Sequence, residues 1–213
     1  FMILFLDVIS PDPEFVLIDN NKVIESLHII DENHNKISDS LQKKFLMLQK
    51  KKDFINNLDY LIICIGPGSY TGLRVGISFM LGISYSKNIP IYGFSCVDLL
   101  SQFIIKKNTN RTILIICSAN NQNFISLPFK NKYCKFKTYK IDGEYITNNI
   151  NLKKYSSCIS NYPLPEKLKN ETLNKIKCLN YKSLKESILQ YLPLISKKQS
   201  IIKPIYISEN KLF

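Results

Sequence analysis

An apolar segment, Tyr60–Ile65, leads directly into Gly66-Pro67-Gly68-Ser69-Tyr70-Thr71-Gly72-Leu73-Arg74-Val75-Gly76. A continuous apolar segment of this length is typical of a buried strand, and glycines beside a proline mark a sharp turn. Ser69 and Thr71 are both suitable N-caps, because a hydroxyl oxygen accepts a hydrogen bond from a backbone N–H of the first helical turn. The run therefore predicts a buried strand, a tight turn and a helix from about Thr71 to Lys87.

The predicted helix carries small residues four positions apart, at Gly72 and Gly76 and again at Ser78, Gly82 and Ser86. Each glycine costs a helix about 1 kcal/mol relative to alanine, so the close approach of another segment is expected to offset that cost. The helix either packs tightly in the core of the chain or serves as a docking face for a partner. Arg74 is one of two arginines in the chain. It suits either bidentate pairing or an ordinary surface salt bridge.

The residues around this run predict the rest of an α/β unit. Three strands are expected first, at Ile3–Leu6, Phe15–Ile18 and Val23–Ile30, followed by a helix on which Ile37, Leu41, Phe45 and Leu48 recur at helical spacing. After the glycine-rich run, Ile89–Phe94 predicts another strand, and Ser95 with Asp98 predicts the capping box of a further helix. The expected order is β-β-β-α-β-α-β-α.

The polar stretch from Lys106 to Arg111 marks the expected boundary between two lobes, 1–108 and 109–213. In the second lobe, strands are expected at Thr112–Cys117, Phe124–Phe129 and Phe136–Ile141. Ser183 with Glu186 predicts a capping box, and Ile201–Ile207 predicts a final extended segment. Two lobes that each begin with strands are the expected organisation.

The amino-acid composition excludes several classes of protein. The chain has 213 residues, 45% of them hydrophobic, so it has the material for a packed core and is not a disordered chain. Its formal charge of +12 suits a nucleic-acid partner, but an AT-rich coding sequence would also enrich lysine. The six cysteines lie at least 17 positions apart, which excludes a CxxC metal or redox pair. The sequence shows neither a signal peptide nor a membrane span, so a reduced cytoplasmic protein is expected.

Few residues suit catalysis. The two histidines, His28 and His34, do not form a His-x-x-x-His metal pair. Asp7, at the end of the first strand, either holds a magnesium-bound nucleotide or satisfies nearby backbone N–H groups. Lysines alternate with aromatic residues around Phe136, between Lys130 and Lys140. This pattern fits either RNA contact or a sheet with one wet face.

Several segments together resemble one known family. Gly66–Gly76 closely resembles the signature of the bacterial TsaB (YeaZ) family, and Ile3–Asp7 is similar to the opening strand of that family. His34 falls where the family commonly has a histidine. Asn88–Ser95 and Lys203–Ser208 resemble its "nIPl-GvSsL" and closing "P-Y-L-R" segments.

The resemblance implies an α/β, two-lobed fold of the actin-like ATPase type (ASKHA, ribonuclease H-like). It also implies a non-catalytic partner of the threonylcarbamoyltransferase TsaD in making N6-threonylcarbamoyladenosine (t6A) in tRNA. The ATPase TsaE would join this heterodimer, and tRNA would be reached through the complex. No tightly bound cofactor is expected, with ATP or ADP bound only in the assembled complex. For the isolated chain, a monomer and a homodimer both fit the sequence.

The resemblance also implies which residues form the site. The expected partner interface lies on two helices and comprises Leu41, Phe45, Leu48, Tyr70, Thr71, Gly72, Leu73, Arg74, Gly76, Ile77, Met80 and Leu81. Gly76→Arg is accordingly expected to leave the fold largely intact and to abolish pairing. The candidates for contact with a nucleotide or another anion are Asp7, Gly66, Gly68 and Ser69, and the alternative is a tight turn with no ligand. No catalytic residue and no metal ligand are expected.

Two departures from the family pattern disfavour nucleotide binding by this chain alone. Val8 and Ile9 follow Asp7 where the family has a hydroxyl residue, and Ser118–Ile125 lacks the acid and the base of the corresponding family segment. The runner-up function is a stand-alone nucleotide-dependent hydrolase or phosphotransferase of the same fold. A third possibility is a tRNA-binding module.

Overall fold

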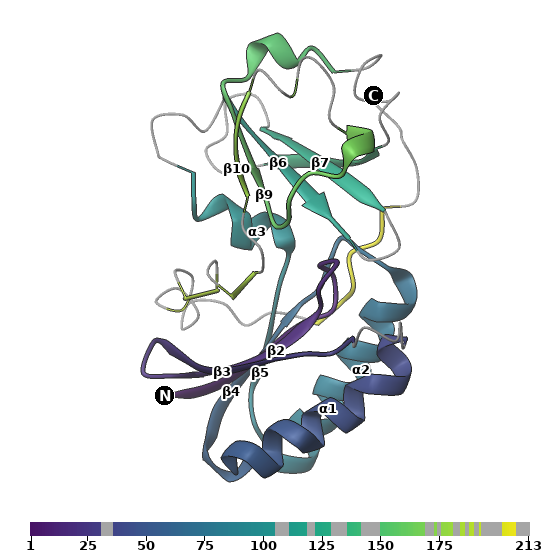
Figure 1. The fold of residues 1–213 in the computed structure, drawn as a ribbon. Helices are drawn as coiled ribbons and strands as arrows, with labels where there is room; N and C mark the ends of the chain where they lie inside the picture. The colour runs from purple at the N-terminus through teal and green to yellow at the C-terminus, as the bar shows by residue number, and fades with distance from the viewer. Residues whose placement is uncertain are drawn as a thin grey trace.

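The computed structural model describes residues 1–30, 36–104, 111–118, 122–128, 136–141, 150–168, 173, 176–180, 184, 185, 188, 189, 192 and 202–207. These residues form two five-stranded sheets, one above the other in Figure 1. The purple and blue sheet at the bottom comes from the first half of the chain, and the teal and green sheet at the top comes from the second half.

The first sheet has the strand order β3-β2-β1-β4-β5. Its first three strands form an antiparallel meander, and β4 and β5 then run parallel to β1. The strands are β1 (Met2–Asp7), β2 (Glu14–Asp19), β3 (Lys22–His28), β4 (Leu58–Cys64) and β5 (Ile91–Phe94). Strands β1, β2 and β4 are almost wholly buried, because they consist of continuous apolar runs.

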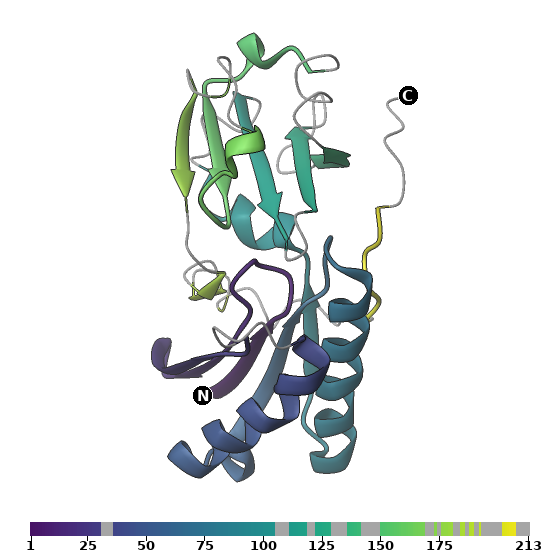
Figure 2. The same cartoon turned by 45° about the vertical axis from the view of Figure 1, so that its right-hand side comes forward.

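Two long helices, α1 (Ile37–Lys52) and α2 (Tyr70–Lys87), lie side by side on one face of the first sheet (Figures 1 and 2). Their contact is centred on Phe45, whose ring lies 5.3 Å from that of Phe79 and 5.9 Å from that of Phe15. Ser69 caps α2 by accepting a hydrogen bond from the backbone N–H of Gly72. A 3-10 helix (Ile55–Asn57) connects α1 to β4.

The third helix, α3 (Cys96–Ser101), begins with the expected capping box between Ser95 and Asp98. It packs against the second sheet, and the larger hydrophobic core continues past it to Leu114, Ile116 and Phe124. The two sheets therefore share part of one core.

The second sheet has the order β10-β9-β6-β7-β8. Strands β6, β7 and β8 form an antiparallel meander, and β9 and β10 run parallel to β6. This is the same arrangement as in the first sheet, with β6 in the place of β1. The elements are β6 (Thr112–Cys117), β7 (Asn123–Pro128), β8 (Phe136–Ile141), β9 (Ser157–Ser160) and β10 (Lys177–Asn180), with 3-10 helices at Leu152–Lys154 and Glu166–Leu168.

The expected α/β, two-lobed architecture is confirmed, and so is the order of the first eight elements. The sequence missed β9 and β10, which are four residues long and lie in a polar region. The expected boundary stretch and the capping box of Ser183 with Glu186 fall mainly outside the described residues, so both stay predictions. Cys64, Cys96, Cys117 and Cys158 are free and buried. Among the described residues, no helix is long and apolar enough to cross a membrane.

Candidate functional site

The glycine-rich turn between β4 and α2 is covered by the chain itself. The backbone N–H of Ile205 donates a hydrogen bond to the carbonyl oxygen of Ile65 at 2.8 Å, which holds residues 202–207 against the turn. Gly66 has a φ of +119°, and a Cβ atom there would lie 2.6 Å from the carbonyl oxygen of Ile205. Glycine is required at this position both by its backbone conformation and by the approach of a distant segment.

The next two candidates for anion contact are also used internally. A Cβ atom at Gly68 would lie 2.8 Å from Cδ1 of Ile9, and the hydroxyl of Ser69 serves as the cap of α2. Gly66, Gly68 and Ser69 are all buried. This packing favours the alternative that the sequence left open, a tight turn without a ligand.

Asp7 lies at the end of β1 and its side chain is fully buried. Its Oδ1 atom accepts hydrogen bonds from the backbone N–H groups of Ile9 at 2.8 Å and Ser10 at 3.1 Å. Burial raises the pKa of Asp7 from 3.8 to about 6, because lost hydration outweighs these hydrogen bonds. Its Oδ2 atom has no hydrogen-bond partner among the described residues. Asp7 thus organises the turn between β1 and β2, and it is not open to solvent.

Asn161 joins the two lobes at this same turn. Its side-chain amide donates hydrogen bonds to Oγ of Ser10 and to the carbonyl oxygen of Cys117, both at 2.9 Å. Its Oδ1 atom accepts a hydrogen bond from the backbone N–H of Cys117 at 2.7 Å. Ser10 and Asn161 are both fully buried. The turn after β1 is therefore tied to the end of β6 by a side chain that no sequence pattern singled out.

The expected partner interface stays a prediction, but the structure shows where its residues lie. Eight of them are buried in the chain's own core: Leu41, Phe45, Leu48, Gly72, Leu73, Gly76, Ile77 and Met80. Apolar residues at helical spacing marked the faces of α1 and α2 that pack on the first sheet, not the faces left open. Tyr70, Thr71 and Arg74 are exposed, and Leu81 is half-buried.

The packing around Gly76 speaks against the expectation that Gly76→Arg leaves the fold largely intact, whereas the expected loss of pairing stays a prediction. A Cβ atom at Gly76 would already lie 2.8 Å from Cγ1 and 3.0 Å from Cγ2 of Val8. Val8 is fully buried beside β1, and its branched side chain has little freedom to move. An arginine at this position would therefore disrupt the packing of α2 on the sheet, and loss of pairing would follow from loss of the fold.

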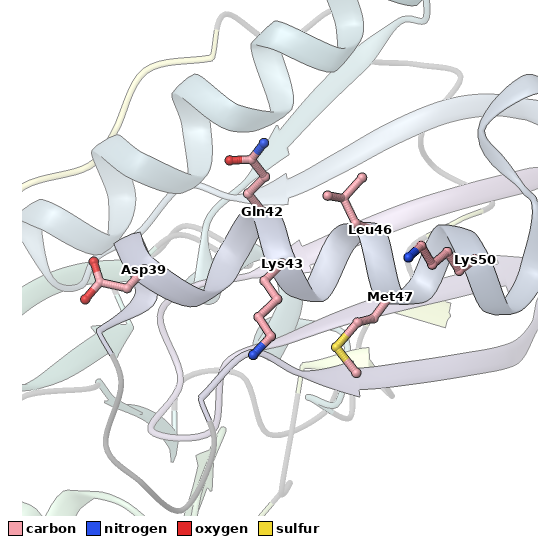
Figure 3. A pocket seen from close by; sticks show the side chains of 6 residues that line it. All are labelled: Asp39, Gln42, Lys43, Leu46, Met47 and Lys50. Carbon is pink, nitrogen blue, oxygen red and sulfur yellow. The ribbon is translucent and has the colours of Figure 1, made fainter.

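The open faces of α1 and α2 carry a different set of apolar groups. Leu46 and Met47 on α1 are 50% and 47% exposed, and Tyr85 on α2 is 83% exposed. A shallow hollow of about 450 Å³ on α1 is lined by Asp39, Gln42, Lys43, Leu46, Met47 and Lys50, whose side chains are drawn in Figure 3. Gln42 and Leu46 point to one side of the helix there, and Lys43 and Met47 point to the other.

Gly82 belongs to the open face of α2. A Cβ atom at this position would have no atom within 4 Å, so nothing in the described part of the chain requires a glycine there. The packing that was expected to offset the cost of glycines is present at Gly72 and Gly76 but not at Gly82. We call the group Leu46, Met47, Leu81, Gly82 and Tyr85 the helix face.

Arg74 makes neither of the two expected contacts. Its guanidinium carbon lies over the ring of Tyr70, 4.1 Å from the ring centroid, and no ion pair of Arg74 is found within the described ranges. The ring of Tyr70 in turn lies 4.8 Å from that of Tyr206. Tyr206 was not among the expected site residues, because its neighbours in space are distant in sequence.

Where the structure describes the remaining candidates, they show no catalytic arrangement. His28 pairs with Asp12 at 2.9 Å on the surface, and His34 lies outside the described residues. In the part of the chain that the structure describes, no group of three or more potential metal ligands is found. In the lysine–aromatic stretch, Lys137 is exposed while Tyr139 and Ile141 are buried, and the residues before Phe136 are not described.

Comparison with known proteins gives a consistent picture. A family model described as "TsaD: tRNA N6-adenosine threonylcarbamoyltransferase" matches residues 28–203. The chain is 30% identical to "tRNA threonylcarbamoyladenosine biosynthesis protein TsaB" of Buchnera aphidicola subsp. Schizaphis graminum (strain Sg), over 72% of this chain and 70% of that protein. It is 25% identical to the TsaB protein of Buchnera aphidicola subsp. Acyrthosiphon pisum (strain APS), over 55% of this chain and 51% of that protein.

A solved structure agrees with these matches in fold. YeaZ from Pseudomonas aeruginosa superposes with a TM-score of 0.65, covers 97% of this chain and 99% of its own, and is 11% identical. At that level of identity the likeness concerns the fold alone. It agrees with the two-lobed α/β arrangement of the two sheets.

Proposed function

Because the chain belongs to the TsaB (YeaZ) family of tRNA threonylcarbamoyladenosine biosynthesis proteins, we propose that it is a non-catalytic partner of the TsaD transferase. Its role in t6A biosynthesis follows from the family. The role as a scaffold that binds TsaD is the proposal. The match of residues 28–203 to the TsaD model supports it, since related chains can pair through equivalent helices about a pseudo-twofold axis.

The open helix face is the observation that carries this proposal. Leu46 and Met47 expose about half of their surface on α1, and Gly82 leaves open space on α2. Exposed apolar side chains favour a protein contact. A glycine without a packing reason in its own chain suits the close approach of a second backbone. The helix face therefore replaces the eight buried residues as the proposed contact with TsaD.

The interior of the molecule supports a non-catalytic role. A catalytic acid or base must reach its substrate, and the carboxylate of Asp7 is fully buried. Asn161 fills the junction between the lobes with hydrogen bonds to Ser10 and Cys117. We therefore propose that ATP or ADP binds only in the complete assembly with TsaD and TsaE, that tRNA is reached through that assembly, and that the assembly works in the cytoplasm.

The first experiment is co-purification of this chain with the TsaD protein of the same genome, followed by a threonylcarbamoylation assay with and without the chain. We expect a stable pair, and modification that requires the chain. ATP turnover by the isolated chain that disappears in Asp7→Ala, together with failure to form a pair, would overturn the proposal in favour of the hydrolase.

Two variants test the helix face within the same experiment. Met47→Asp and Gly82→Arg are both expected to weaken pairing at least about ten-fold, because each places a charge in a contact that excludes water. Ile24→Asp is the matched control, since Ile24 is 39% exposed and lies on the edge strand β3, not on α1 or α2. Pairing that is equally weak in the control would show that charge alone, and not the helix face, caused the loss.

A further inference from the structure

Two tyrosines and an arginine form an exposed stack at the start of α2. The rings of Tyr70 and Tyr206 lie 4.8 Å apart at an angle of 38°, and the guanidinium of Arg74 lies 4.1 Å above the ring of Tyr70. Tyr70 remains 51% exposed and Tyr206 remains 41% exposed. Large aromatic groups are thus assembled at the surface without being buried there.

The stack is held in place by buried structure beneath it. Tyr70 and Arg74 lie four residues apart, on one side of the first turn of α2. Tyr206 follows Ile205, whose backbone N–H donates to the carbonyl oxygen of Ile65 and whose carbonyl oxygen lies against Gly66. In Figure 2 the yellow segment that contains Tyr206 runs beside the upper end of α2. Groups that are fixed before binding lose little conformational entropy when a ligand arrives.

The two segments that form the stack carry no acidic residue. At the start of α2 the one charged residue is Arg74, and residues 202–207 carry one charged residue, Lys203, which is exposed. The guanidinium carbon lies 4.1 Å from the ring centroid of Tyr70, and within the described ranges no carboxylate pairs with its N–H groups. The complementary ligand combines a flat ring with an anion.

We propose that Tyr70, Tyr206 and Arg74 form a binding site for an unpaired nucleotide of RNA. The exposed aromatic rings would stack on the base, and the guanidinium would donate hydrogen bonds to a phosphate. An unpaired base is required because a base inside a duplex does not offer its faces to a side chain. An acidic protein segment would satisfy Arg74 but would leave the aromatic faces unused, so RNA fits the stack better. This inference rests on the proposed function, which brings a tRNA to the complex.

The test is fluorescence anisotropy of the full chain with a labelled RNA hairpin that has a single-stranded loop, and with a fully paired duplex of equal length. Tyr206→Leu and Arg74→Gln are each expected to weaken hairpin binding about ten-fold. Arg74→Gln should also reduce the salt dependence by about one phosphate contact, and Arg74→Lys should not restore stacking. Tyr206→Phe keeps the aromatic ring and should bind the hairpin like the wild type. This comparison shows whether the loss in Tyr206→Leu comes from the missing ring.

The chain offers matched controls for both kinds of residue. Tyr92→Ala removes a ring from a second tyrosine pair, Tyr60 and Tyr92, whose ring centroids are 5.7 Å apart. In the described part of the chain no arginine lies over this pair. Lys87→Gln removes one positive charge from the far end of the same helix. Each control should change hairpin binding by less than about two-fold.

Three results would overturn the proposal. In the first, the wild type does not bind the hairpin. In the second, the stack variants and the controls lose equal amounts of hairpin affinity. In the third, the stack variants lose as much affinity for the duplex as for the hairpin. Unchanged RNA binding with lost TsaD pairing would assign the stack to the protein partner. The proposed function fails on a different result: a wild-type chain that does not pair with TsaD or is not needed for modification.

Discussion

At the scale of single residues, Asp7 shows how a position at a strand end can be structural in spite of its chemistry. An acid after the first strand suggested a nucleotide contact, but its carboxylate binds the backbone of its own turn at Ile9 and Ser10. Glu14, which lies opposite Asp7 in the register of β1 and β2, is also fully buried and adds to the repulsion. The resulting rise in pKa can be measured as a dependence of stability on pH.

Asp7→Asn should change how stability varies with pH. Because the pKa of Asp7 rises from 3.8 to about 6 on folding, protonation stabilises the folded state. That stability is fully present below pH 3.8 and is lost as the pH rises through about 6. On lowering the pH from about 8 to about 4.5, the wild type should therefore gain about 2 kcal/mol relative to the variant. Urea unfolding at several pH values measures this difference.

The matched control is Asp39→Asn, which removes a carboxylate from the exposed surface of α1. A difference between wild type and Asp7→Asn that stays constant across this range of pH would contradict the buried, proton-binding state of Asp7.

At the scale of elements, α2 combines two kinds of glycine in one helix. Gly76 permits contact with Val8, whereas Gly82 faces open space. A glycine in this helix therefore allows close packing at position 76, whereas at position 82 it lies on an open surface. Gly76 meets Val8, just after β1, whereas Gly82 meets no other part of the described chain. The spacing along the helix cannot reveal this difference.

Gly76→Ala and Gly82→Ala should change stability in opposite directions. Gly82→Ala should raise the free energy of unfolding by about 1 kcal/mol, because alanine favours the helix and its methyl group meets nothing. Gly76→Ala should lower it by about 1–3 kcal/mol, because the new Cβ atom would crowd the branched side chain of Val8. Urea denaturation of both variants gives the two values, and shifts of the same sign would disprove the assignment of the two faces.

At the scale of the whole molecule, the two lobes repeat one sheet order and are joined at the turn after β1. The meander followed by two parallel strands occurs once in residues 2–94 and again in residues 112–180. Asn161 connects the two halves through Ser10 and Cys117. This buried amide suggests that the lobes unfold together.

Asn161→Ala should weaken the junction between the lobes. The substitution removes the hydrogen bonds of the Asn161 amide to the N–H and carbonyl groups of Cys117 and to the hydroxyl of Ser10. A buried polar group that loses its hydrogen bond costs about 1–3 kcal/mol of stability. We expect the free energy of unfolding to fall by at least about 2 kcal/mol and the two lobes to unfold in separate transitions. Calorimetry measures both effects. Asn151→Ala, at an exposed asparagine, is the control and should stay within about 0.5 kcal/mol of the wild type. A single transition at the temperature of the wild type would rule out this role for Asn161.

The sequence by itself determined the elements of the first lobe and the family. Its turns, caps and helical spacings are local patterns, and the capping pair of Ser95 and Asp98 or the N-cap Ser69 acts within three residues along the chain. Family resemblance depends on the order of such patterns along the chain, so the residues alone carry it. In the second lobe, the short strands β9 and β10 have weak local patterns, and the sequence did not reveal them.

Only the tertiary structure decided which surfaces are free. The periodicity of α1 and α2 marked an apolar face but could not tell whether the sheet of the chain or a partner covers it. The cover of the glycine-rich turn by Ile205 and the contact between Asn161 and Ser10, 151 residues apart, join segments that no local pattern relates. The same holds for the stack of Tyr70 and Tyr206. Burial and contact are properties of the folded chain in three dimensions, and for that reason the helix face and the stack emerge only in the folded molecule.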